Sequence, residues 1–226
     1  MQTPVPIPGF ADPLSSWTHL VGAAVFLVLG VRLMRRHRAH GGHVAALLVL
    51  CVSSVLLLSL SGVYHLLERG GAARPVLRQL DHAAIFVLIA GSLTTVHGLL
   101  FAGRMRWLII TLAWCVCAAG VTLKLVFFAQ TPEWLGLTAY FGMGLIGLVS
   151  TLSLWWLHGL AFVGLWLGGG LTYTAGALVD FLRLPVIVPG VLGPHELLHV
   201  AVLVALGLHW RFVTRVIERE NATLRA

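Results

Sequence analysis

Two histidines four residues apart form the sharpest chemical motif in the sequence, His195-Glu196-Leu197-Leu198-His199. Side chains at positions i and i+4 share one face of a helix, so both imidazoles can reach one metal ion. The pattern matches H-E-x-x-H, the zinc-binding motif of metalloproteases. On its own, the motif fits equally well a pair of histidines at a helix end that contact lipid headgroups. Other residues must therefore distinguish a metal site from a headgroup contact.

Two further groups of polar residues are of types that occur in metal sites. Ser61 lies one helical turn before His65, and Asp81 follows directly after a charged loop. Taken alone, a serine in an apolar helix usually bonds a backbone carbonyl, and an aspartate before a helix is usually its N-cap. Their relation to the histidine pair depends on where the helices place them.

The composition excludes a water-soluble fold. Of 226 residues, 58% are hydrophobic and only 10% are charged, whereas a soluble domain carries roughly 25% charged residues. The Lys and Arg residues behind the net charge of +7 fall mainly between or after the apolar segments, so they predict membrane anchoring and no nucleic-acid partner. Four arginines in and after the first apolar segment are expected to contact anionic lipid headgroups: Arg32, Arg35, Arg36 and Arg38.

Seven apolar runs, each long enough for a transmembrane helix, divide the chain. They cover residues 15–33, 44–67, 82–101, 107–128, 134–154, 159–179 and 195–216. The division near 155–159 rests on paired tryptophans beside a glycine, which indicate a hairpin at the membrane interface. The expected fold is an all-α integral membrane protein, a single seven-transmembrane helix bundle over residues 1–226 with an intramembrane metal site.

Counting membrane crossings places the polar features together. The second span ends, and the third and seventh begin, on the same side of the membrane. Five side chains therefore lie in one leaflet: Ser61, His65, Asp81, His195 and His199. Ionisable groups at membrane depth are costly and usually pair or bind something. Three imidazoles and a water molecule make the open tetrahedral site of a catalytic zinc ion, although such a site also accepts cobalt, nickel or copper.

The neighbouring side chains suit hydrolysis. Zinc lowers the pKa of a bound water molecule to about 7 and polarises a carbonyl group. Asp81 is placed to hold or deprotonate that water, and Ser61 to bond Asp81 or a developing oxyanion. Glu196 is an alternative general base, as in soluble zinc proteases with this motif. His19 begins the first span on the same side and is expected to support the site.

The motifs together resemble the hemolysin III branch of the progestin and adipoQ receptor (PAQR) family, within the CREST superfamily that includes alkaline ceramidases. The three main blocks are S-x-x-x-H at 61–65, LDHAAIFVLIAG at 80–91 and HELLH at 195–199. Weaker matches are THLVG at 18–22, GGLTYTAG at 169–176 and His209. The combination is specific, although no block is specific alone.

The resemblance implies a seven-helix bundle with intramembrane zinc at the positions of His65, His195 and His199. It implies that Asp81 reaches the zinc through water, with Ser61 beside it. Relatives hydrolyse ceramide-like lipid amides or bind hormones, so a membrane lipid or lipid-like substrate is expected. A multi-pass location in the bacterial inner membrane is also expected. Receptor members have a cytoplasmic N-terminus, whereas the arginine distribution here predicts an external one, and both orientations stay open.

Among the functions that fit these features, a zinc-dependent hydrolase of a lipid amide or ester is favoured. A non-enzymatic receptor or regulator would use the zinc as a structural staple between spans. An intramembrane metalloprotease would need a later carboxylate ligand, whereas Asp180 precedes the motif. A cytolysin is disfavoured because so hydrophobic a chain lacks the soluble form that secreted pore formers need. The sequence specifies no oligomeric state.

Overall fold

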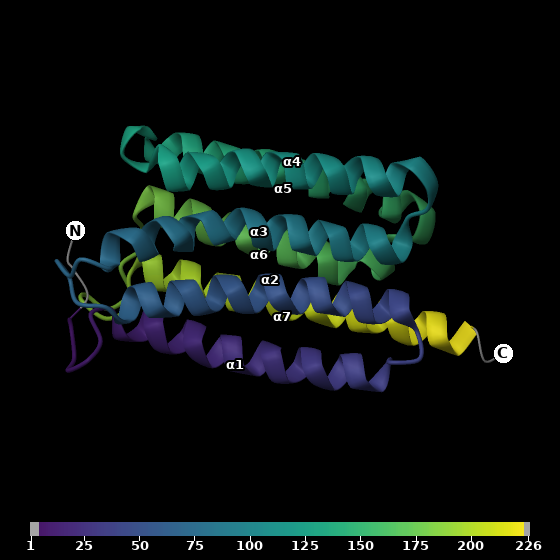
Figure 1. The fold of residues 1–226 in the computed structure, drawn as a ribbon, viewed down its shortest axis with the longest axis horizontal. Helices are drawn as coiled ribbons and strands as arrows, with labels where there is room; N and C mark the ends of the chain where they lie inside the picture. Colours follow the sequence, from purple (N-terminus) through teal and green to yellow (C-terminus); the bar gives the residue numbers. More distant parts are fainter. Residues whose placement is uncertain (1–4, 224–226) are drawn as a thin grey trace.

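The chain forms a bundle of long helices that run side by side in alternating directions (Figure 1). The structure, a computed structural model, describes residues 5–223. Its helices are α1 (Pro13–Arg36), α2 (Gly41–Leu66), α3 (Arg74–Leu100), α4 (Gly103–Val126), the short 3-10 helix η1 (Phe128–Gln130), α5 (Glu133–His158), α6 (Leu160–Leu182) and α7 (Pro194–Thr223). Within residues 5–223, seven helices are long and apolar enough to cross a membrane. The predicted all-α membrane fold is confirmed.

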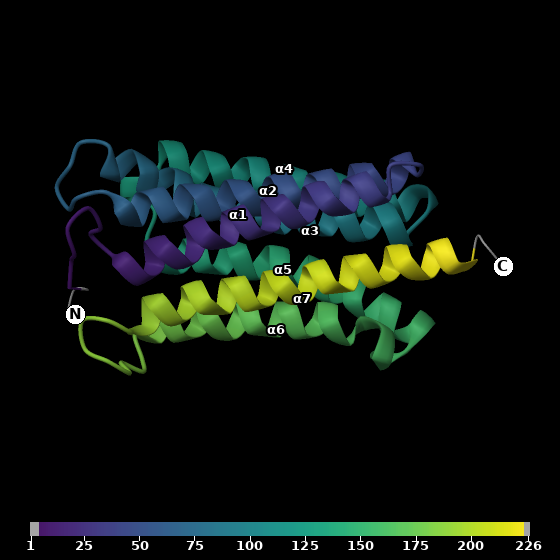
Figure 2. The same cartoon turned by 90° about the horizontal axis from the view of Figure 1, so that it is seen from below.

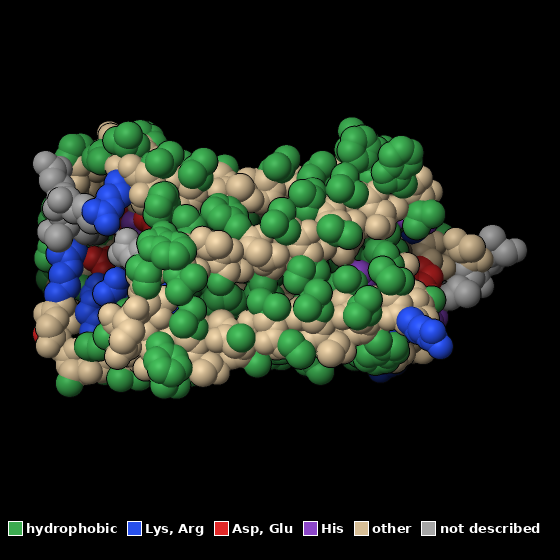
Figure 3. Space-filling model, turned by 90° about the horizontal axis from the view of Figure 1, so that it is seen from above, with side chains coloured by type: hydrophobic (Ala, Val, Ile, Leu, Met, Phe, Trp, Pro, Cys, Tyr) green, Lys and Arg blue, Asp and Glu red, His purple; other side chains and the backbone are tan. Residues whose placement is uncertain are grey.

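Charged side chains gather at the two ends of the bundle. Figure 3 shows Lys, Arg, Asp and Glu side chains at both ends of one face, with hydrophobic side chains over its middle. Between the ends, α4, α5 and α6 expose large apolar side chains, among them Leu112, Leu145 and Leu171. Because hydrocarbon solvates apolar groups and not charges, this distribution is that of a multi-pass integral membrane protein.

The interior lies mainly between α1, α2, α3 and α7. Each of α1 to α3 packs along its successor, and α6 packs along α7. Leu58, Phe86 and Trp210 are almost completely buried in this core. At Gly62 the helices come so close that a Cβ atom would lie 2.7 Å from Leu20 Cγ. Small residues of this kind allow transmembrane helices to approach closely.

Helix boundaries differ from the predicted spans at two places that bear on function. The predicted third span, 82–101, overlaps α3, which ends at Leu100 and begins earlier, at Arg74, because Pro75 is favoured in a first helical turn. Asp81 is therefore inside a helix and is not its N-cap. The predicted seventh span, 195–216, lies within α7, which continues to Thr223. The chain turns between α5 and α6 at Gly159, whose φ of +81° is unstrained for glycine.

The two ends of the bundle are built from different segments (Figures 1 and 2). Residues 5–12 before α1, the α2–α3 loop and the α6–α7 loop lie at one end, here called the N-terminal end. The α1–α2 turn and the last turns of α7 lie at the other, here called the C-terminal end. At 1.5 Å per residue, the 30 residues of α7 span about 45 Å. This single helix therefore contributes side chains to both ends.

Candidate metal centre

Three histidines from two helices meet at the N-terminal end of the bundle. His65 lies in the last turn of α2, and His195 and His199 occupy the first turns of α7. The Nε2 atom of His195 is 3.2 Å from Nε2 of His65 and 3.2 Å from Nε2 of His199. Two ligands at zinc–nitrogen distances of about 2.0–2.1 Å and a tetrahedral angle lie about 3.3–3.4 Å apart. Two of the three nitrogen pairs therefore have the spacing of ligands around one zinc ion, and all three candidate ligand atoms lie within 4.8 Å of one another.

Two of these histidines are held by carboxylates at their other ring nitrogen. Nδ1 of His65 is 3.1 Å from Asp12 Oδ2, and Nδ1 of His195 is 3.1 Å from Asp180 Oδ1. Because a carboxylate oxygen accepts, each Nδ1 carries the hydrogen and each neutral ring has a bare lone pair on Nε2. When both rings are neutral, the two Nε2 atoms face each other across 3.2 Å with no hydrogen between them. A cation between the rings would stabilise this arrangement, as in carboxylate–histidine–zinc sites.

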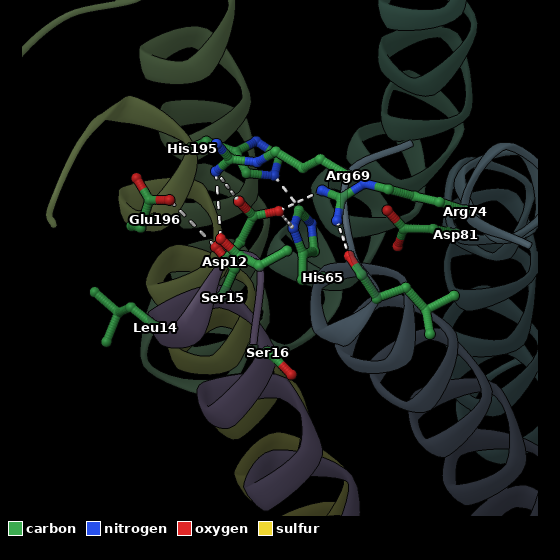
Figure 4. A network of polar contacts seen from close by, with 12 residues as sticks. Asp12, Leu14, Ser15, Ser16, His65, Arg69, Arg74, Asp81, His195 and Glu196 are labelled. Atoms are coloured by element: carbon green, nitrogen blue, oxygen red, sulfur yellow. Dashed lines mark hydrogen bonds and ion pairs between the residues drawn. The ribbon is translucent and has the colours of Figure 1, made fainter. Parts of the chain in front are cut away.

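Asp12 is the centre of an ion-pair cluster beside His65 (Figure 4). It is the N-cap residue of α1, yet its side chain makes no capping bond. Its oxygens instead accept from Arg69 Nη2 at 2.6 Å and Arg74 Nη2 at 2.5 Å. Burial alone would raise the pKa of this carboxyl group, but the hydrogen bonds from its imidazole and guanidinium partners outweigh burial and hold the pKa well below its usual range. Asp12 is therefore ionised and suited to hold the Nδ1 hydrogen of His65.

The predicted pair of Ser61 and Asp81 meets between α2 and α3. The Ser61 hydroxyl group donates a hydrogen bond to the Asp81 carboxylate. Both residues are buried, at 3% and 9% exposure, and Figure 4 shows Asp81 on α3 near the cluster. Ser61 lies one turn before His65 on α2. The pair supplies a proton-accepting group close to the three histidines.

The other two predicted residues have different surroundings. Glu196 accepts a hydrogen bond from the backbone N–H of Gly193 at 3.0 Å, and its other oxygen lies 3.4 Å from Ser15 Oγ. These contacts direct its carboxylate to the first turn of α7 and to α1. The His19 ring lies against the His199 ring with centres 3.9 Å apart and planes tilted by 36°, and its Nε2 lies 3.4 Å from the His199 carbonyl oxygen. Thus His19 packs directly against a candidate ligand, while Glu196 stabilises a helix end.

The structure adds residues to this site that the motifs did not reveal. Asp12 and Asp180 bond candidate ligands, and Arg69 and Arg74 bond Asp12. Counting membrane crossings places all four residues on the side of His65 and His195. Asp12 precedes the first span, Arg69 and Arg74 follow the second, and Asp180 lies at the end of the sixth. A test for acidic residues on that side of the membrane would have found both carboxylates.

Comparisons with a family model and with a curated relative indicate the same family for this chain. A family model described as haemolysin-III related matches residues 10–210. A relative, the Hemolysin-3 protein of Bacillus cereus, is 29% identical over 164 residues, which cover 71% of this chain and 74% of the relative. The region matched by the family model includes the three histidines, the Ser61–Asp81 pair and both carboxylates that hold the imidazoles.

Proposed function

Because this chain belongs to the haemolysin-III-related family, we propose that it is a zinc-dependent hydrolase of a lipid amide or ester. The observation that carries the proposal is the convergence of three Nε2 atoms, two of them on rings whose Nδ1 is held by a carboxylate. The serine–aspartate pair beside them supplies acid–base chemistry. When bound, zinc would supply a Lewis acid that polarises a carbonyl group and makes water easier to deprotonate.

The protein side chains divide the remaining work. Asp81 would accept a proton from the attacking water and return it to the departing amine or alcohol as the C–N or C–O bond breaks. The Ser61 hydrogen bond would keep the Asp81 carboxylate oriented for both transfers. The substrate class follows from location, since the histidines lie at the ends of membrane-spanning helices, where membrane lipids are concentrated.

A test compares purified wild-type protein with Asp81→Asn on a panel of lipid amides and esters. The variant keeps a side chain of the same shape that cannot accept the proton, so turnover is expected to fall by about 100-fold or more. Metal content is measured in the same samples. Glu68→Gln, which neutralises an exposed carboxylate in the nearby α2–α3 loop, is the matched control and should retain turnover. Unchanged turnover in metal-loaded Asp81→Asn protein would disprove the assigned role.

A second candidate is a receptor or regulator in which the metal is structural. It is favoured by the origin of the three histidines, because one ion would join the end of α2 to the start of α7. In that case, chelation would lower the thermal unfolding temperature of the wild-type protein by many degrees, and no lipid in the panel would be hydrolysed. Turnover that depends on Asp81 would exclude this candidate.

A further inference from the structure

A second polar site lies at the C-terminal end of the bundle. A pocket of about 430 Å³ opens between the α1–α2 turn and the last turns of α7. Its volume is in the range of small-molecule sites. Its polar lining residues are Arg36, His37, His40, Glu218 and Asn221. None of these residues belongs to the candidate metal centre at the other end.

Two polar atoms on residues that line this pocket lack hydrogen-bond partners in the part of the chain that the structure describes. Nδ2 of Asn221 lies 3.0 Å from Nδ1 of His37. An amide nitrogen only donates, so Nδ1 accepts and the neutral imidazole carries its hydrogen on Nε2. That Nε2–H group and the Asn221 Oδ1 atom are both buried and unpaired. Each unpaired atom is a cost to the folded protein, and because both atoms are enclosed, a ligand in the pocket would pair with them only after the His37 or Asn221 side chain turns toward it.

The same pocket presents opposite charges. Arg36 Nη1 and Glu218 Oε1 are 3.9 Å apart, with side chains 68% and 42% exposed. An exposed pair at this distance is weak, so both groups can move to a ligand at little cost. A matching ligand would offer an anionic acceptor to Arg36 and His37. It would also offer a cationic N–H donor to Glu218 and Asn221.

The pocket also lies at the level of lipid headgroups. Arg35 and Arg36 form the last turn of α1, directly after its apolar stretch, and arginines at such a position mark the membrane interface. A phosphate joined to a primary ammonium group has the required acceptor, donor and both charges. We propose that this pocket binds a phosphoethanolamine group, carried by a lipid headgroup or free in solution.

The test measures binding to the purified full-length protein in detergent by native mass spectrometry. Phosphatidylethanolamine is compared with phosphatidylcholine, which has no N–H donor, and with phosphatidylglycerol, which has no cation. Phosphatidylethanolamine is expected to bind about tenfold more tightly than either, since each competitor loses a charged hydrogen bond. Soluble phosphoethanolamine is the further arm. Equal binding of this compound identifies a free ligand, and binding of the lipid alone identifies a headgroup site.

Variants assign the binding to this pocket. Arg36→Gln and Glu218→Gln should each weaken phosphatidylethanolamine binding about tenfold. Arg38→Gln removes an exposed arginine outside the lining of the pocket and should leave binding unchanged. Thermal unfolding without lipid checks that each variant is folded. Equal affinity for phosphatidylglycerol, no effect of Glu218→Gln, or an equal effect of Arg38→Gln would each overturn the proposal.

Discussion

The two ends of the bundle contain similar residues in different arrangements. Each end gathers several histidines with nearby carboxylates. At the N-terminal end, aspartates bond two Nδ1 atoms and the Nε2 atoms converge. At the C-terminal end, Glu220 bonds Nε2 of His43 at 3.0 Å, and the rings of His40 and His43 stack with centres 5.0 Å apart. No metal-ligand cluster is found there among residues 5–223.

This contrast shows that residue content alone does not define a metal site. Neutral imidazole binds metal through its one bare nitrogen, so the partner of the other nitrogen decides where that lone pair points. Carboxylates at Nδ1 direct two lone pairs to a common point. At the C-terminal end, the carboxylate at Nε2 of His43 leaves Nδ1 bare and buried, but among residues 5–223 this nitrogen does not join two other ligand atoms in a cluster. The following predictions test this difference.

The largest effect is expected from removing the three histidines of the candidate metal centre. The triple variant His65→Ala, His195→Ala, His199→Ala should lose bound zinc, from about one ion per chain to none. The matched triple variant at the other end replaces His37, His40 and His43 by alanine and should retain it. Elemental mass spectrometry gives the metal content, and circular dichroism confirms helix content. Loss of metal from both variants would show that the two ends do not differ in this way.

Removing a carboxylate partner should have the next largest effect. Asp12→Asn is expected to lower zinc affinity by about 10- to 100-fold because the imidazole loses its ionised partner. Asp180→Asn should have a smaller effect, since the Asp180 side chain is 38% exposed and that of Asp12 only 8%. Competition with a chelator measures both affinities. Glu220→Gln, which changes the carboxylate partner of His43, is the control at the other end and should leave zinc affinity unchanged.

Two glycines in the α1–α2 contact, one near each end, can test whether a packing defect affects zinc binding only when it lies near the metal centre. Gly62→Ala would place a Cβ atom 2.7 Å from Leu20 Cγ near the metal centre, and Gly30→Ala would place one 2.5 Å from Cys51 Sγ toward the other end. Each should cost about 1–3 kcal/mol of stability. Only Gly62→Ala should also weaken zinc binding, because it separates α2 from α1 close to His65. Equal zinc affinities in the two variants would contradict this.

The smallest effect is a pH dependence at the C-terminal end. Burial, Arg36 and the neighbouring His43 lower the pKa of His37 from 6.5, and His40 adds to this, while Glu218 opposes it. His37 therefore binds a proton more readily in the unfolded chain than in the folded protein. Its contribution to the free energy of unfolding is fully present above pH 6.5 and is lost as the pH falls below that value. Between about pH 7.5 and about pH 5.5, wild-type protein should lose more thermal stability than His37→Gln protein. The metal centre is common to both proteins, so its own pH dependence cancels in the difference. An equal loss in the two would exclude His37 as the cause.

The fold and the central part of the candidate site could be predicted from the sequence. Apolar runs separated by charges are sufficient to predict seven helices, because hydrocarbon requires helical backbone and apolar side chains. Counting crossings then placed His65, His195 and His199 in one leaflet, and the structure brings them together. The three blocks that resembled the hemolysin III branch belong to a chain that the family model matches from residue 10 to 210.

Counting crossings also places Asp12 and Asp180 on the same side of the membrane as these histidines, but it does not predict which histidine each carboxylate contacts. Asp12 precedes a helix that begins with proline, which is the usual pattern of an N-cap, and only the tertiary packing of α1 against α2 brings it to Nδ1 of His65. The predicted third span begins eight residues after the start of α3 because Arg74 and Arg78 interrupt the apolar pattern, while a helix can continue through polar turns outside the hydrocarbon. Nothing in the sequence pattern indicates a role for the histidines at and beside the α1–α2 turn, because their contacts with α7 involve residues 177 and 184 positions away.

The length of α7 gives the two ends a thermodynamic connection. One unbroken helix carries His195 and His199 in its first turns and Glu218 and Asn221 in its last. A ligand at either end that favours one axial position or rotation of this helix would change the affinity of the other end. Linkage requires the two changes to be equal, so a lipid that tightens zinc binding by a given factor would itself be bound more tightly by the same factor when zinc is present.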